Sequence, residues 1–547
     1  MLKRVGVLLG LISIATSPWT TYDPINPLKF LLLGICGSSC IVFLILNRKS
    51  FKLDKVVFSA SLVFIFQALI STVFSESNFT QNLYGYHGRY FGLFTWVMLF
   101  SIMLYLSLIQ EFIFILRVFL IVGSVSLAYS IIQYLGVDPA PWANNFNPII
   151  GFLGNPNFHS SFLGLFLVAL CGLLLLKLKS PMQAIFIFLF IIVTALLISS
   201  SGSIQGLFVA ATGVASFGMY YLFAKGLVKT FWSLSTSALI TLVFFALSVI
   251  GVGPLEPLIH RGTLAIRGDY WLAALSMAKD NILTGVGPDQ FGTWYRFYRH
   301  ENAITRVNAS VVTDSAHNGY LDFAANLGIT ALIAYFILII YAVIVMGKYI
   351  RRHDSLDLSH ATLAALFFGF QAQFLISPNQ IGLVIWGWVF LGAIFGFADD
   401  EDTTNKVTPK PKKTPSKLVK TEDHFSLIGV SLLGTLIGLL ITGPIFYSSM
   451  QFRSALVKAD AIKIISAANV WPRNENLLRY SANLLFTNNL QQQGITIVKL
   501  GLSEFPNSFD LWNAKLSYKW ISEIEKSEAL EQLRRLDPLN PEWASKE

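Results

Sequence analysis

Long apolar runs separated by short polar stretches dominate the chain as far as residue 448. Many of these runs approach the roughly 20 apolar residues that an α-helix needs to cross the hydrocarbon core of a bilayer. The runs fall near residues 4–18, 28–47, 56–75, 92–109, 113–135, 159–176, 182–199, 204–223, 233–252, 329–347, 361–377, 381–398 and 426–448. The pattern predicts an all-α protein, a polytopic transmembrane helical bundle of about 13 spans.

Composition supports a membrane protein and excludes several other classes. Hydrophobic residues make up 54% of the chain and charged residues 13%, about half the charged share of an average soluble domain. The net charge of +9 does not indicate a nucleic-acid partner, because most basic residues lie in the loops between apolar runs. Cys36, Cys40 and Cys171 all lie in apolar runs without polar partners, so we expect packing residues and neither a disulfide framework nor a metal site. No cofactor is expected.

Basic residues alternate between the two sides of the predicted bundle. Lys3 and Arg4 precede the first run, which lacks a small-residue cleavage site and is interpreted as an uncleaved helix with a cytoplasmic N-terminus. The loops then assigned to the cytoplasm contain Arg48, Lys49, Lys52, Lys55, Arg117, Lys177, Lys179, Lys225, Lys229, Lys348, Arg351 and Arg352. The short outer loops contain only Lys29, at a span edge, and Arg89. This asymmetry follows the positive-inside rule and predicts a multi-pass protein of the cytoplasmic (inner) membrane.

Three segments are not predicted to span the membrane. Residues 253–328 form a long extracytoplasmic loop within a core that covers residues 1–398. Residues 399–425 are rich in Pro, Lys and Thr, which is typical of a disordered cytoplasmic linker. The last span, 426–448, then places residues 449–547 outside the cell.

The C-terminal segment is periodic. Pro472, Pro506 and Pro538 are spaced by 34 and 32 residues, with helix-forming stretches between them. A period near 34 is typical of tetratricopeptide-like helical hairpins, although an ordinary helical domain with chance proline spacing is the alternative. In both cases we expect a binding or docking module, with a protein partner as one possibility.

Polar residues that could take part in chemistry are concentrated in the loop 253–328. Residues 267–278 are predicted to form a helix, which the glycine-rich stretch "TGVGPDQF" then ends. A second helix is expected to start at Thr313 or Asp314 and to carry His317 and Tyr320 on one face. Three arginines lie between these helices and are interpreted as side chains that reach to the membrane interface. They are Arg296, Arg299 and Arg306.

Arg261, Arg267 and His317 belong to this loop and therefore lie on the same side of the membrane. Arginine offers a fixed fork of donors that fits two phosphate oxygens, and histidine exchanges a proton near neutral pH. Together they suit an anionic lipid-phosphate donor and a hydroxyl acceptor. The alternatives are an arginine at the interface and a histidine that only forms a hydrogen bond at a helix end.

Four stretches carry a family resemblance. They are "GRYFGLFTWVMLF" at 88–100, "GFLGNPNFHSSFLGLFL" at 151–167, "R-x3-W" with "TGVGPDQF", and "SAHNGYLDFAANLGI" at 315–329. In this order they resemble the O-antigen ligase / O-antigen polymerase superfamily of bacterial envelope enzymes, and the resemblance covers roughly residues 80–330. The tail resembles tetratricopeptide-like tails found on some members.

The resemblance implies transfer of a glycan from an undecaprenyl-pyrophosphate carrier to an acceptor hydroxyl, outside the membrane and without metal. The acceptor would be a lipid, a polysaccharide or a protein. By motif, Arg267 would hold the pyrophosphate, His317 would handle the proton, and Asn318 would orient the imidazole or the sugar. A base opposite the leaving group would give inversion at the anomeric carbon.

Other polar residues of these stretches are candidates for substrate binding. They are Arg89, Arg261, Gln205, Gln290, Asn155 and Asn157. Gln205 stands where many members have an arginine, so it would donate hydrogen bonds to a phosphate without supplying charge. Asn155 and Asn157 would contact sugar, or they would only form the "NPN" turn.

Competing functions remain at this point. A transporter or lipid-linked glycan flippase is also a basic protein of many helices, but carriers place ionisable groups near the bilayer midplane, where this chain has almost none. A protein O-oligosaccharyltransferase is a second alternative, and a scaffold whose tail recruits partners is a third.

Overall fold

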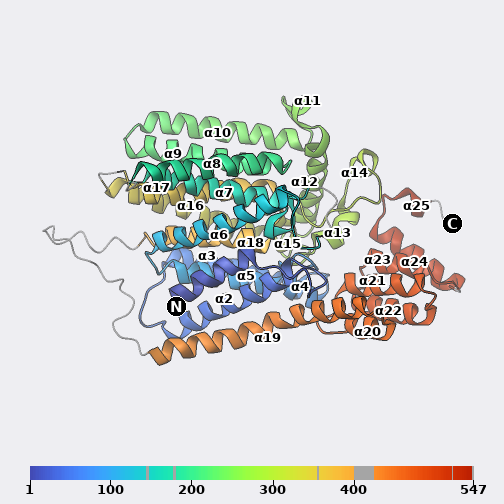
Figure 1. Cartoon of the computed structure of the whole chain (residues 1–547). Helices are drawn as coiled ribbons and strands as arrows, with labels where there is room; N and C mark the ends of the chain where they lie inside the picture. Colours follow the sequence, from blue (N-terminus) through green and yellow to red (C-terminus); the bar gives the residue numbers. More distant parts are fainter. Residues whose placement is uncertain (143–146, 177–179, 354–355, 399–423, 520, 545–547) are drawn as a thin grey trace.

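The protein is described by a computed structural model that covers residues 1–142, 147–176, 180–353, 356–398, 424–519 and 521–544. These residues fold into helices that run side by side in one bundle, with a smaller helical region at one end (Figure 1). The bundle helices are α1 (Leu2–Ile14), α2 (Asn26–Leu46), α3 (Lys55–Phe74), α5 (Leu93–Leu106), α6 (Phe112–Tyr134), α7 (Pro156–Leu175), α8 (Pro181–Ser200), α9 (Gln205–Ala224), α10 (Val228–Val249), α16 (Ile329–Arg352), α17 (Leu358–Ile376), α18 (Ile381–Phe395) and α19 (His424–Val457).

Each predicted apolar run overlaps one of these helices. Ten of the described helices are long and apolar enough to cross a membrane, and α5 and α18 are shorter apolar helices. The all-α multi-pass architecture is thus confirmed, while the total of thirteen spans stays a prediction. The predicted linker 399–425 lies almost wholly outside the described residues.

Polar residues in front of the apolar runs start several helices. The Asp54 carboxylate accepts hydrogen bonds from the amides of Val56 and Val57, which caps α3. Lys29 lies in the first turn of α2, fully buried, and its Nζ donates to the carbonyls of Ile12 and Ser13. Lys29 therefore satisfies carbonyls at the end of α1. The sequence analysis had instead assigned it to an outer loop, at a span edge.

Small residues let α2 and α19 lie against each other. A Cβ added at Gly34 would come within 2.3 Å of the Thr442 side chain, and one at Gly438 within 2.6 Å of the Ile35 backbone. Such close backbone approach is the usual basis of helix association in membranes. The last membrane helix is thereby packed along the first hairpin of the bundle.

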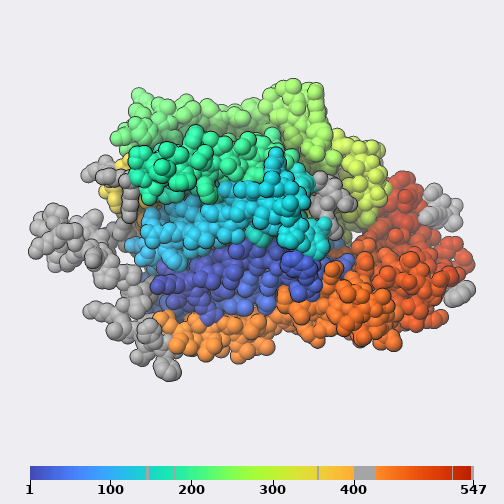
Figure 2. Space-filling model, in the orientation of Figure 1, coloured from blue at the N-terminus to red at the C-terminus, as the bar shows by residue number. Residues whose placement is uncertain are grey.

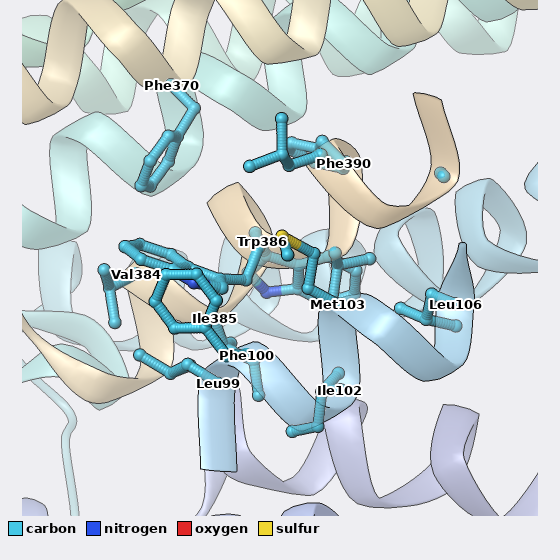
Figure 3. Packing of buried hydrophobic residues seen from close by; sticks show 14 of the residues in the cluster. Leu99, Phe100, Ile102, Met103, Leu106, Phe370, Val384, Ile385, Trp386 and Phe390 are labelled. Carbon is cyan, nitrogen blue, oxygen red and sulfur yellow. The ribbon is translucent and has the colours of Figure 1, made fainter. Parts of the chain in front are cut away.

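The centre of the bundle is formed by the two shorter apolar helices. Every residue of α18 is buried, and its Trp386 and Phe390 lie among α5 side chains such as Met103 (Figure 3). Trp386 also donates to the Ser13 hydroxyl at 2.8 Å. These helices are surrounded by protein, so their length does not have to match the bilayer.

The segment 253–328 folds at one end of the bundle (Figure 1). Its helices are α11 (Glu256–Ile259), α12 (Gly262–Asp280), α13 (Phe291–Tyr298), α14 (Glu301–Arg306) and α15 (Gly319–Leu327). Met277, Phe291, Tyr295 and Ala325 belong to a separate buried cluster inside this segment. The segment is therefore a folded cap on the bundle, built on its own small core.

The C-terminal region lies at the same end of the bundle and continues directly from α19 (Figure 2). Its helices are α20 (Ala461–Ala468), α21 (Glu475–Thr487), α22 (Gln491–Glu504), α23 (Phe509–Lys515), α24 (Glu523–Leu536) and α25 (Pro541–Ala544). Pro472, Pro506 and Pro538 lie between helices, and each interval between two prolines holds a pair of contacting helices. The helical tail is confirmed, and its assignment to the tetratricopeptide type stays a prediction.

Candidate functional site

The glycine-rich turn 284–290 is held against the end of α15. The amides of Val286 and Gly287 donate to the carbonyls of Ala325 and Asn326, at 2.9 and 3.0 Å. Gly285 has φ +63°, and a Cβ there would come within 2.3 Å of the Asn326 carbonyl, so this position requires glycine. The turn and α15 therefore form one rigid unit next to the bundle.

His317 does not lie on a helix face, contrary to the prediction. The helix begins at Gly319, and the Asn318 side-chain oxygen caps it by accepting from the amides of Tyr320 and Leu321. Thr313 bonds the Ser315 carbonyl instead of starting a helix. His317 itself has φ +53°, a backbone conformation that non-glycine residues adopt mainly where the surroundings enforce it, as they often do at functional sites.

The His317 imidazole is half-buried and loosely bonded. Its Nδ1 lies 3.3 Å from the Ser315 hydroxyl and 3.5 Å from the Thr313 hydroxyl, and its ring lies 5.4 Å from that of Tyr270 on α12. Burial lowers the pKa of His317, the charge of Arg267 lowers it further, and Asp314 partly opposes both. The imidazole is therefore neutral at neutral pH and able to accept a proton.

Arg267 lies on α12 and is close enough for its charge to act on the same imidazole. Its Nη1 donates to the Ile376 carbonyl at 3.0 Å, and no carboxylate pairs with it among the described residues. Burial lowers the pKa of its guanidinium, so the charged form is incompletely compensated here. A half-buried cation of this kind favours an incoming anion. The two residues that the sequence identified first are thus electrostatically coupled, and their roles stay a prediction.

Arg89 lies beside them, but its guanidinium is already occupied. Its Nε donates to Asp289 at 2.9 Å and its Nη1 to Asp314 at 3.2 Å. Burial opposes its charge, but Asp314 and Asp289 outweigh this and raise its pKa. Asp289 also accepts from the amides of Tyr86 and Phe91, so it joins the "GRYFGL" and "TGVGPDQF" stretches. In this structure Arg89 organises the site and its paired donors are not free for a ligand.

Asp322 was missed by the sequence reasoning. Its Oδ1 accepts from the Ala316 amide at 2.8 Å, while its buried Oδ2 has no hydrogen-bond partner among the described residues. Burial raises its pKa to about 7, although Arg89 and the Ala316 amide work in the opposite direction. Asp322 therefore fixes the backbone next to His317 and changes charge near neutral pH. The sequence could have indicated Asp322, because it is an acidic residue in the first helical turn after the "HN" motif.

The contacts of His317 among the described residues include none of the remaining candidates. Arg261 is exposed at the start of α12, and Gln205 is 3% exposed and accepts weakly from Ser161, at 3.5 Å. Asn155 caps α7 through the Asn157 amide, which agrees with the turn interpretation of "NPN". Gln290 is buried and follows Asp289 directly, but its side chain bonds Thr293.

The interfacial interpretation is wrong for Arg299, which is fully buried, and all three loop arginines have carboxylate partners. Arg299 and Arg296 both pair with Asp537 of the tail, at 2.6 and 3.3 Å, and Arg306 pairs with Asp269 at 2.9 Å. The Arg299 and Asp537 side chains are fully buried. Sequence alone could not identify these partners, because 238 residues separate Arg299 from Asp537.

The fold and the loop site define a multi-pass helical membrane protein with its polar chemistry at one end of the bundle. Residues 160–336 match the protein-family model described as O-Antigen ligase. The chain therefore carries an O-antigen ligase domain within a multi-pass helical protein, which makes it a membrane enzyme. None of the curated proteins matches the chain. The match contains Arg267 and His317, and it leaves out Arg89 and the tail.

Proposed function

We propose that the protein transfers a glycan from undecaprenyl pyrophosphate to an acceptor hydroxyl, with Arg267 and His317 as the reacting pair. The supporting observation is that the charge of a half-buried arginine, whose hydrogen-bond partner among the described residues is a backbone carbonyl, acts on a neutral imidazole. A phosphate group would supply the negatively charged partner that the Arg267 guanidinium lacks among the described residues. The imidazole supplies a proton acceptor within the same site.

The reaction we propose is a direct displacement. Arg267 binds the pyrophosphate and stabilises the charge that grows on it as the sugar leaves. His317 takes the proton from the acceptor hydroxyl as that oxygen bonds the anomeric carbon. The bond between the sugar and the pyrophosphate breaks, its electron pair leaves with undecaprenyl pyrophosphate, and the anomeric configuration inverts. Base catalysis contributes about 10²–10⁴-fold to such a step.

Supporting residues give the pair its geometry. Asn318 caps α15 immediately after His317, and Asp322 holds the Ala316 amide immediately before it. Both act on the backbone and leave the ring free. Arg89 contributes through Asp289 and Asp314, and it would contact donor only if these carboxylates released it.

We place the site on the outer side of the cytoplasmic membrane, which follows from the positive-inside distribution of Lys and Arg. The loop and the tail lie at the same end of the bundle, so one orientation accounts for both (Figure 1). The proposed domains are the core 1–398, the linker 399–425, the last membrane helix 426–448 and an outer tail 449–547 of tetratricopeptide-like type.

The test is transfer by the purified protein in lipid vesicles that contain undecaprenyl-pyrophosphate glycan. Candidate lipid, polysaccharide and protein acceptors are added in separate reactions. We expect His317→Ala and Arg267→Ala to abolish transfer, and only Arg267→Ala to weaken binding of the donor. Movement of donor across the bilayer without cleavage would instead identify a flippase, and full activity of both variants would exclude the proposed pair.

A further inference from the structure

A cavity of about 240 Å³ lies between the bundle end and the tail. One wall comes from the bundle side, with residues 76–78, Gln81, Gln290 and Thr293. The other wall comes from the tail, with Glu475 and residues 503–508. The cavity exists only because the tail is docked, through bonds such as Asn78 Nδ2 to the Glu504 carbonyl at 2.8 Å and Asn507 Nδ2 to the Glu76 carbonyl at 3.2 Å.

The lining has the chemistry of a sugar-binding site. It combines carboxylates, side-chain amides and hydroxyls, which accept from and donate to hydroxyl groups. Pro506, which is exposed, adds apolar surface against which a sugar ring can pack. None of the lining residues is Lys or Arg, so the cavity offers no side-chain cation to a phosphate or a carboxylate.

Two polar side chains are built into the wall, of which Gln290 is buried and Glu475 is half-buried. Gln290 is fully buried, and Glu475 forms side-chain hydrogen bonds with Ser508 of the tail and Gln81 of the bundle side. Burial raises the pKa of Glu475 to about 7. Around this pH, Glu475 can therefore either donate a hydrogen bond as an acid or accept one as a carboxylate.

The cavity adjoins the His317 site across the glycine-rich turn. Gln290 lines the cavity, while its neighbour Asp289 binds Arg89 on the other side. Ser77, also in the lining, donates to the Val286 carbonyl of the same turn at 2.6 Å. The cavity and the Arg89–Asp289 pair are therefore connected through adjacent residues of the glycine-rich turn.

We propose that this composite cavity binds one neutral or amino-bearing sugar unit of the acceptor glycan. The proposal rests on the proposed function, because it makes the cavity an acceptor subsite next to the transfer site. The volume lies below the roughly 300–1,000 Å³ of pockets for drug-sized ligands, which suits a single sugar ring. Acidic sugars and sugar phosphates are excluded by the carboxylates of Glu76 and Glu475.

The experiment measures binding of three single sugars that differ in charge. The full-length His317→Ala protein in lipid nanodiscs is titrated at pH 8 with N-acetylglucosamine, glucosamine and glucuronic acid, and binding is followed by saturation-transfer NMR. We expect the first two to bind and glucuronic acid to bind roughly tenfold more weakly or not at all. Equal binding of all three, or binding of none, overturns the proposal.

Ser503→Trp is the blocking variant, because Ser503 is exposed and lines the cavity. Thr496→Trp is its matched control, since Thr496 is exposed on the same helix and does not line the cavity. We expect only Ser503→Trp to abolish binding while both keep the thermal transition of the parent. Unchanged binding in Ser503→Trp refutes the site.

Glu475→Gln supplies a second test that keeps the shape of the cavity. At pH 8 we expect it to weaken glucosamine binding and to leave N-acetylglucosamine binding in place, and equal losses for both contradict the role of its charge. Transfer by the wild type is measured in parallel. If the cavity binds sugar but the wild type shows no transfer, the proposed function is contradicted and the sugar site stands. If the wild type transfers glycan but the cavity binds no sugar, only the sugar site is contradicted.

Discussion

At the scale of single residues, the site depends on the balance of charges around one imidazole. Burial and Arg267 favour the neutral form of His317, and Asp314 favours the protonated form. A neutral imidazole is required if His317 is to take a proton from an acceptor hydroxyl. The carboxylate of Asp314, which is bonded to Arg89, raises the pKa of His317. It therefore influences the pH below which His317 becomes protonated and can no longer act as a base.

Replacing Asp314 by Asn should move the pH dependence of transfer. The Asp314 charge raises the pKa of His317, so its removal lowers that pKa, and activity should persist to lower pH than in the wild type. The measurement is kcat/KM for the acceptor between pH 5 and 8. Asp280→Asn, at an exposed position at the end of α12, is the control. A shift of the acid limb to higher pH would contradict the assignment of His317 as the base.

Side-chain chemistry and the family resemblance made Arg267 and His317 candidates from the sequence, and their roles stay a prediction. The carboxylates that surround them were not identified, because their partners are distant along the chain: Asp289 bonds Arg89 across 200 residues and Asp314 bonds it across 225. Asp322 has a role that could not be identified from the sequence, for another reason. It lies in the same motif as His317, but its role depends on a backbone amide that only the folded loop presents.

At the scale of elements, the length of the apolar runs predicted the membrane helices. Each of them meets the same requirement, which is enough consecutive apolar residues to cross the hydrocarbon core of a bilayer. The start of α15 was mispredicted because three nearby residues can cap a helix and only tertiary packing selects among them. Asn318 caps α15, while the Thr313 hydroxyl bonds the Ser315 carbonyl. His317 consequently lies on a loop whose shape the glycine-rich turn and Asp322 determine.

Gly285→Ala tests how far the turn positions the site. A left-handed φ costs an added Cβ about 1–2 kcal/mol, and the contact with Asn326 adds a further penalty. We expect a lower thermal transition and a loss of transfer. Gly262→Ala is the control, because Gly262 has φ +52° but nothing within 4 Å of the added Cβ. Equal effects of the two substitutions would show that the packing of the turn against α15 is unimportant.

At the scale of the whole molecule, the tail packs against the loop segment at one end of the bundle (Figure 1). Asp537 accepts from Arg296 and Arg299, and the Arg296 guanidinium lies 4.0 Å from the ring centre of Phe509. The sequence indicated a docking module, and the structure shows that this module docks on its own chain. Composition and period could not reveal this, because both arginines and Asp537 are ordinary surface residues until the two parts meet.

Asp537→Ala should release the end of the tail from the loop. Removing one partner of a buried ion pair leaves uncompensated charge and typically costs about 3–5 kcal/mol. We expect faster hydrogen exchange in residues 291–298 and 523–536, measured by mass spectrometry on the protein in nanodiscs. Glu523→Ala, which removes an exposed pair with Lys526, should leave exchange in these segments unchanged. Unaltered protection in Asp537→Ala would mean that other contacts hold the tail.

The continuity of α19 has a mechanical consequence. Its 34 residues correspond to about 51 Å of helix, well beyond a hydrocarbon core of about 30 Å. We expect the surplus length to extend beyond the bilayer, where it connects the tail to the membrane-spanning part by one continuous helix. A change in the tilt of α19 should therefore move the tail with it.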